Sequence, residues 1–122
     1  MLDGVVAESG AVEETPDCVA CLVTAPVERA REIAAAVVEG RLAACVNIVP
    51  GVESIYRWEG EVADDREALL VIKTTRAAVA PLTAAIRAVH PYENFELVAL
   101  GIDAGSPAYL RWIVESVAAG GG

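Results

Sequence analysis

Residues 41–60 read Arg-Leu-Ala-Ala-Cys-Val-Asn-Ile-Val-Pro-Gly-Val-Glu-Ser-Ile-Tyr-Arg-Trp-Glu-Gly, and they predict one unusually long β-strand. The stretch is apolar from Leu42 to Val49, is interrupted at Pro50-Gly51, and resumes with bulky residues as far as Trp58. Proline cannot donate to a sheet and glycine permits a sharp bend, so the pair indicates an edge or a bulge. Because strands usually have about 5 or 6 residues, we expect the second half to project beyond its own sheet.

The projecting half carries aromatic side chains, although only 5% of the chain is aromatic. Tyr56 and Trp58 lie just before the turn predicted at Glu59-Gly60. An exposed strand edge needs protection, and pairing with another subunit is one way to provide it. The sequence therefore predicts an oligomer.

Composition limits the possible functions. The chain has 122 residues, which suits one domain. Its net charge of −9 argues against nucleic acid and anionic membranes as partners. No apolar run is long enough to span a bilayer, and the N-terminus lacks the basic start of a secretory signal, so we expect a cytoplasmic protein. We expect a flexible acidic leader over 1–16, a domain over 17–117 and a flexible tail over 118–122.

Hydrophobic periodicity predicts the order βαββαβ followed by a C-terminal helix. The expected elements are a strand over 18–24, a helix over 26–40, the strand from 42, a polar loop or fraying extension over 63–66, a strand over 68–75, a helix from about 80 to 90, a strand over 95–102 and a helix from 107 capped by Ser106. This order predicts an α+β fold, a ferredoxin-like sandwich with both main helices on one face of an antiparallel sheet. Since the strands are apolar on both sides, we expect other subunits to cover the other face.

Three cysteines do not make a disulfide framework. Cys18 and Cys21 form a C-x-x-C pair, which admits a metal or redox interpretation. They lie in an apolar strand, where residues three apart point to opposite faces, and no second pair completes a zinc site. We therefore interpret both as structural, and we expect Cys45 in the core.

The single histidine, His90, follows a predicted helix and precedes Pro91. Together with Glu93 and Glu96 it offers the mixture of nitrogen and oxygen donors that suits Cu(II) or Zn(II). A histidine at a helix C-terminus is also favoured by the helix dipole alone. A metal ligand and a packing or capping residue are both open interpretations.

Other residues are candidates for a binding cleft. Lys73 ends an apolar strand, where a charge needs a partner, so it either binds an anionic group or pairs with Glu59 or Glu96. The hairpin residues Tyr56, Trp58 and Glu59 either pack between subunits or line a cleft with His90 and Tyr92. The chain has no nucleophile motif and no glycine-rich phosphate loop. We therefore assign no catalytic residues and do not expect an enzyme.

Several blocks together resemble the CutA family of divalent-cation tolerance proteins. The blocks are Arg41-Leu-Ala-Ala-Cys-Val-Asn-Ile48, Pro50-Gly51, Ser54-x-Tyr56-x-Trp58-Glu59-Gly60, Lys73-Thr74, His90-Pro-Tyr-Glu93 and Tyr109-Leu-x-Trp112. The resemblance covers about residues 18–116. It implies a trimer similar to PII-type signalling proteins, with long hairpins packed across subunits, and a link to copper and other divalent metals.

Two positions depart from the pattern of that family. Asn94-Phe95 replaces a common proline-containing sequence after Glu93, and Val23 stands where some members carry a cysteine that is a candidate copper ligand. The resemblance therefore brings no cysteine ligand to this chain.

The resulting hypothesis is a homotrimer, held by the hairpin and a sheet face, that binds copper, another divalent metal or a small ligand in metal homeostasis or signalling. We expect no cofactor to be required for folding. The alternatives are a structural or partner-binding scaffold and an enzyme that acts at a cleft between subunits.

Overall fold

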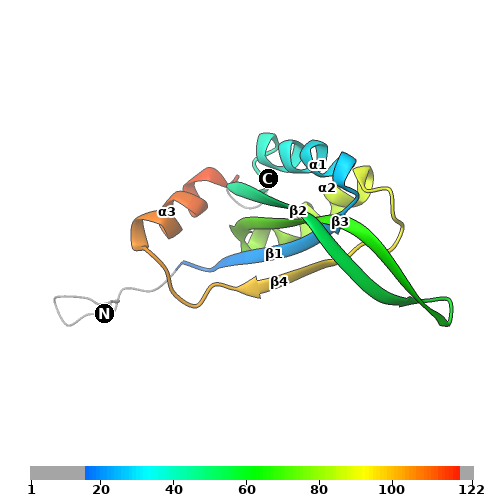
Figure 1. The fold of residues 1–122 in the computed structure, drawn as a ribbon. Helices are drawn as coiled ribbons and strands as arrows, with labels where there is room; N and C mark the ends of the chain where they lie inside the picture. The colour runs from blue at the N-terminus through cyan, green and yellow to red at the C-terminus, as the bar shows by residue number, and fades with distance from the viewer. Residues whose placement is uncertain (1–15, 119–122) are drawn as a thin grey trace.

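The computed structural model describes residues 16–118, which form one antiparallel sheet and three α-helices (Figure 1). Of the predicted leader and tail, only Pro16 and Ala118 fall within this range. In chain order, the elements are β1 (Cys18–Ala25), α1 (Val27–Glu39), β2 (Cys45–Trp58), β3 (Glu61–Thr75), the 3-10 turn η1 (Arg76–Ala78), α2 (Val79–Val89), β4 (Leu97–Gly101) and α3 (Pro107–Ser116).

The topology confirms the predicted ferredoxin-like sandwich. The strand order is β2-β3-β1-β4, and β1 pairs antiparallel with both β3 and β4. The helices α1 and α2 both lie over one side of the sheet (Figure 1). No helix within residues 16–118 is long and apolar enough to cross a membrane.

The main core lies between the sheet and these two helices. Alternate residues of β1, namely Val19, Cys21, Val23 and Ala25, are buried on this side. The helix α1 buries Ala30, Ile33, Ala34 and Val37, a spacing of three and four residues that places them on one helical face. Leu82 and Ile86 do the same for α2. Core residues thus recur every second residue in β1 and about every 3.6 residues in the helices, and all of them face one core.

A second, smaller cluster forms at one end of the sheet, where α3 packs. It contains Cys18, Ala44, Leu110 and Ile113. Because Cys18 belongs to this cluster and Cys21 to the main core, the two cysteines face opposite ways, as their spacing predicts. Arg41 fixes the end of α3 by donating to the carbonyl oxygens of Glu115 and Ser116.

The hairpin of β2 and β3 forms an arm that extends beyond the sheet (Figure 1). The bend is a register shift between Val49 and Val52, where Gly51 has a φ of 78°. At the tip, Glu59 and Gly60 have φ values of 50° and 83°, the two positive angles that a type I′ turn needs.

Three predicted details need correction. Of the two alternatives for residues 63–66, a loop or a fraying extension, the loop is wrong, because β3 begins at Glu61 and these residues pair with β2. Water solvates both faces of a two-stranded arm, so a polar sequence there still forms a strand. The strand β2 begins at Cys45 rather than Leu42, whose N–H donates to the Val37 carbonyl at the end of α1. Ser106 precedes α3 without a side-chain cap, and its carbonyl accepts from Leu110 N–H.

Part of the sheet face opposite α1 and α2 is exposed, and it is apolar. Leu100 is paired with Ala20, and Val98 with Leu22, on this face, and Val49 lies on it in β2. Leu100 is 52% exposed, and Val98 and Val49 are also exposed. We call Val49, Val98 and Leu100 the open face. They lie on the two edge strands, with the half-buried apolar residues Leu22, Leu69 and Val71 between them. An exposed apolar sheet face of this kind marks an interaction surface.

Truncation of the main core tests how the fold is held. Ile86→Ala removes a fully buried side chain between α2 and the sheet, so we expect a loss of about 2–5 kcal/mol in the free energy of unfolding. Val62→Ala is the control, because Val62 is 70% exposed on the arm and should change it by less than about 0.5 kcal/mol. Urea unfolding at one protein concentration measures both, and equal losses would contradict this core.

Candidate functional site

The candidate residues gather where β1 ends, under the loop that follows α2. His90 is buried there, and its Nε2 lies 2.8 Å from the carbonyl oxygen of Thr24. Its Nδ1 accepts the backbone N–H of Tyr92 at 3.1 Å. Since Nδ1 accepts, Nε2 carries the proton and donates to Thr24. Both ring nitrogens of the neutral imidazole are therefore occupied, and they tie the loop to β1.

Aromatic rings complete the surroundings of His90. Phe95 stacks on the imidazole with a centroid distance of 4.9 Å, and Tyr92 lies tilted at 5.1 Å. The Arg87 guanidinium lies over the Phe95 ring, 5.1 Å from its centroid. This packing fixes the side chain of His90 within the protomer.

The predicted metal ligands do not converge in a single protomer. Glu96 accepts from the Thr24 hydroxyl at 3.4 Å, whereas the backbone carbonyl of Glu93 accepts from Arg87. Within residues 16–118, no group of three or more His, Cys, Asp or Glu side chains is close enough to hold a metal ion. Of the two interpretations of His90, the protomer geometry corresponds to the packing one.

Two tyrosines and two carboxylates come together beside this loop, at the base of the arm. Tyr56 donates its hydroxyl to Asp65, and this hydrogen bond, with a smaller contribution from burial, raises the pKa of Tyr56 to about 12. Burial raises the pKa of Tyr92, helped by the negative charges of Glu67, Asp65 and Glu28. We call Tyr56, Asp65, Glu67 and Tyr92 the acidic–aromatic cluster.

Glu67 is the member of this cluster that is most deeply buried, at 5% exposure. It lies in β3 opposite Val52, and it is close enough to Tyr92 to help raise the pKa of that phenol. The ion pairs formed within residues 16–118 are Arg29 with Glu32 and Arg76 with Asp17. Glu67 is thus a buried carboxylate without a cationic partner in the described chain.

Of the two interpretations of Lys73, an anion site and an ion pair with Glu59 or Glu96, the described protomer does not form the ion pair. The Lys73 ammonium donates instead to the side-chain oxygen of Asn47. The reason is distance along the sheet. Lys73 faces Ala20, whereas Thr24 faces Leu69, so Lys73 lies roughly 13 Å along β3 from the His90 end.

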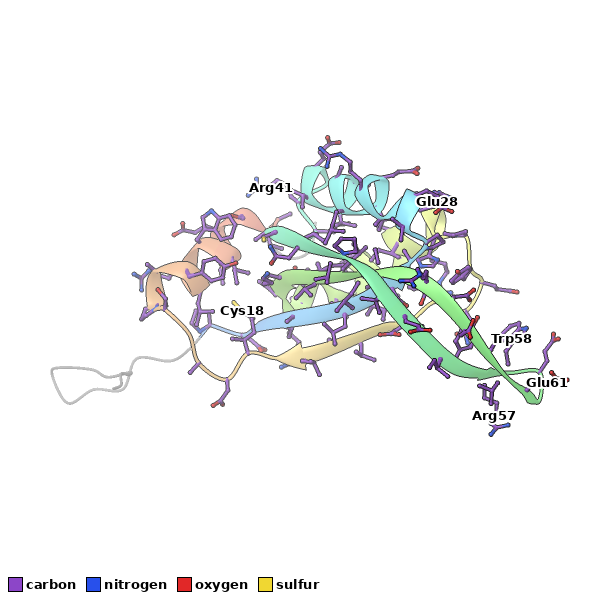
Figure 2. The ribbon with its side chains drawn as sticks, viewed as in Figure 1. Cys18, Glu28, Arg41, Arg57, Trp58 and Glu61 are labelled. Atoms are coloured by element: carbon purple, nitrogen blue, oxygen red, sulfur yellow. The ribbon has the colours of Figure 1, made fainter. Side chains whose placement is uncertain are left out.

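The predicted cleft residues therefore occupy three separate places in the protomer. Tyr56, His90 and Tyr92 lie near one another, as their mutual contacts and effects show. Trp58 lies towards the tip of the arm, far from Cys18 and Arg41 (Figure 2). Glu59 belongs to the turn at the tip, and Lys73 lies towards the end of β3.

The cysteines show no redox or metal arrangement in the described residues. Cys18, Cys21 and Cys45 are all free. Burial raises the pKa of the Cys18 and Cys21 thiols, so their reactive thiolate forms are disfavoured. Cys45, expected in the core, is only half-buried, because it lies on the sheet face opposite α1 and α2, where α3 covers it incompletely.

Sequence reasoning missed Thr24, Asp65 and Glu67. The sequence offers one signal for Glu67. It lies two residues before Leu69 in the predicted strand, so it shares a side of β3 with Leu69, Val71 and Lys73. Nothing in that spacing indicates that Tyr92, which comes from a distant loop, lies against it.

The hydrogen bond between Tyr56 and Asp65 predicts a late phenol titration. Absorbance at 295 nm should show one tyrosine ionising near pH 12, and Tyr56→Phe should abolish that step. Asp65→Asn should move it towards the ordinary value of about 10. Because folding raises the pKa of Tyr56, its hydrogen bond to Asp65 stabilises the folded state fully below about pH 10. This contribution to the free energy of unfolding is lost as the pH rises through about 12. As a control, Tyr109→Phe should retain the step, and its loss there would contradict the assignment.

Comparison with known proteins places the chain in a family. The family model described as CutA1 divalent ion tolerance protein matches residues 19–116. The divalent-cation tolerance protein CutA of Thermus thermophilus is 55% identical over 96 residues, which are 78% of this chain and 93% of that protein. The mouse protein CutA is 50% identical over 106 residues, 84% of this chain, and the match spans only 60% of the mouse protein.

Solved structures agree with the fold. The Thermus thermophilus protein has a TM-score of 0.81 at 52% identity, covering 83% of this chain and 99% of that one. A PII-like protein CutA from Nostoc has a TM-score of 0.78 at 33% identity, covering 82% and 97%. The names of these relatives describe tolerance to divalent cations or a PII-like fold, and none describes a reaction. This chain therefore belongs to the CutA1 family of divalent ion tolerance proteins.

Proposed function

We propose that this protein is a homotrimer that binds a divalent cation, copper among them, or a small ligand in metal homeostasis or signalling. The trimer proposal rests on the open face, with Leu100, Val98 and Val49 exposed on a sheet whose other side packs against α1 and α2. A second copy of the chain is the occupant that we propose for this face. The number of three copies rests on the resemblance to PII-type proteins, supported by the similarity to the PII-like protein of Nostoc.

The arm supplies the second contact of this assembly. It carries exposed apolar residues at Ile55, Trp58 and Val62, which a lone protomer leaves in water. The strands β2 and β4 are the two edges of the sheet, so each has unpaired backbone groups along one side. An arm that reaches a neighbouring copy buries these apolar side chains and protects an edge at the same time.

The ligand site that we propose is a cleft between subunits. Its residues are Tyr56, Trp58, Glu59, Lys73, His90 and Tyr92. Because they lie in three places of one protomer, a complete cleft needs the arm or the sheet of another copy. Clefts at such boundaries are common sites for ligands.

Metal binding at His90, Glu93 and Glu96 requires a local rearrangement. Nδ1 of His90 must release the Tyr92 N–H, or Nε2 must release Thr24, and Glu96 must turn from the Thr24 hydroxyl. We therefore expect metal binding to be coupled to opening of the loop from Pro91 to Glu96. A pure scaffold is the second candidate function, favoured by the lack of a clustered metal site in residues 16–118.

We propose a cytoplasmic location, since free cysteines, two of them buried, suit a reducing compartment. The net charge of −9 supports a protein that binds neither nucleic acid nor anionic membranes.

Sedimentation tests the assembly. At micromolar concentration the protein should have three times the protomer mass of 12.7 kDa. Leu100→Glu places a charge on the open face and should produce monomers, because a buried unpaired charge is costly. Val27→Glu is the matched control, since Val27 is also exposed (48%) but lies on α1. A wild-type monomer, or equal effects of the two changes, would contradict the interface.

Calorimetric titration with Cu(II) and Zn(II) tests the metal site. Wild type should bind, and His90→Ala should weaken binding at least about tenfold, since one of three ligands is lost. Glu115→Gln, an exposed position on α3, is the control. Undiminished binding by a trimeric His90→Ala protein would exclude His90 as a ligand, and a wild type that binds neither metal would favour the scaffold.

A further inference from the structure

We propose that the acidic–aromatic cluster at the base of the arm binds an organic cation, an ammonium or guanidinium group, between Tyr56 and Tyr92. This inference rests on the proposed function, because it names the chemical class of ligand for one part of the proposed cleft. It goes beyond that function by assigning Asp65 and Glu67 as the residues that hold the charge.

The starting point is the buried charge of Glu67. A carboxylate that is 5% exposed has lost most of its water, and this loss is costly unless another charge or several hydrogen bonds replace the water. Residues 16–118 supply no cation to Glu67. Its neighbour Tyr92 offers one hydroxyl, whereas a carboxylate has about four acceptor positions. The carboxylate therefore retains unused acceptor positions beside Tyr92.

The groups around Glu67 increase the negative charge. Asp65 lies two residues earlier in β3, on the same side of the strand, and accepts from Tyr56. Glu28, at the start of α1, contributes to the negative potential at Tyr92 (Figure 2). Carboxylates from two elements, β3 and α1, therefore create a negative potential at the cluster. No cation of the described chain forms an ion pair with them.

Aromatic rings decide which kind of cation fits. Tyr56 and Tyr92 are each 39% exposed, so both rings remain accessible beside the carboxylates. Ring faces attract ammonium and guanidinium groups, most strongly where water is partly excluded. Within the described chain, no three metal-ligating side chains are clustered here. Two aromatic rings with two carboxylates suit an organic cation better than a bare metal ion.

This cation has two possible sources, a free amine or guanidine and an arginine of a neighbouring copy. The arm carries Arg57 and Arg66, both exposed, and Arg57 projects near the tip of the arm (Figure 2). If a neighbouring arm fills the site, free ligand should bind only after these arginines are replaced. The two sources share one chemistry, and the experiment separates them.

Calorimetry at constant ionic strength uses methylguanidinium and tetramethylammonium chloride as probes, with sodium chloride as the blank. We expect saturable binding by wild type, or by the Arg57→Gln/Arg66→Gln variant if a neighbour fills the site. Glu67→Gln keeps the shape of the side chain and should weaken binding at least about tenfold, and Asp65→Asn, at an exposed position, should also weaken it. Tyr92→Leu should weaken binding, whereas Tyr56→Phe, which keeps the ring, should change it less.

Glu61→Gln is the matched control, because it removes one negative charge at the exposed tip of the arm (Figure 2). It should leave the affinity unchanged. Equal weakening by Glu61→Gln and Glu67→Gln would overturn the site, since only the net charge would then matter. Lack of saturation in both the wild type and the arginine variant would also overturn it, as would full affinity in a folded Glu67→Gln protein.

Sedimentation of the same samples separates this inference from the proposed assembly. A trimer that binds neither probe refutes the organic-cation site alone. A monomer that binds a probe in a Glu67-dependent manner refutes the trimer and retains the site.

Discussion

Pairing of β1 with β3 on one side and β4 on the other is the constraint on which the structure depends. It places β1 in the middle of the sheet, so the side chains of Cys18–Ala25 alternate between the main core and the opposite face. Two helices cover one face, but the short α3 covers only one end of the other. The open face and the proposed assembly both follow from this imbalance between an apolar sheet and the helices available to cover it.

Much of the fold could be predicted because its signals are local. The continuous apolar run of β1, the spacing of Ala30, Ile33 and Val37 in α1, and Pro107 at the start of α3 each identify an element from a few residues. The extension of β3 to Glu61 could not be predicted in this way. Its polar residues form a strand only because β2 lies beside them, and pairing between strands is not encoded in either strand alone.

The candidate site was harder to predict, because its members come from distant parts of the chain. His90 was identified as important, yet its sequence context cannot indicate that its two nitrogens contact Thr24 and Tyr92. Glu67 was missed because burial of a carboxylate depends on which loop covers it. Asp65 was assigned to a polar loop or a fraying extension, and only the folded arm brings its carboxylate to the Tyr56 hydroxyl. Predictions from pattern are thus strongest for backbone elements and weakest for contacts between them.

The division of the C-x-x-C pair between two clusters has a consequence for local stability. Cys21 belongs to the large core with α1 and α2, whereas Cys18 belongs to the small cluster with α3. Fewer buried side chains secure α3, and local opening costs less where fewer contacts must be broken. Backbone amides of α3 should therefore exchange with deuterium through partial unfolding, while those of central β1 exchange only when the whole domain unfolds. One strand would thus join two regions that open independently.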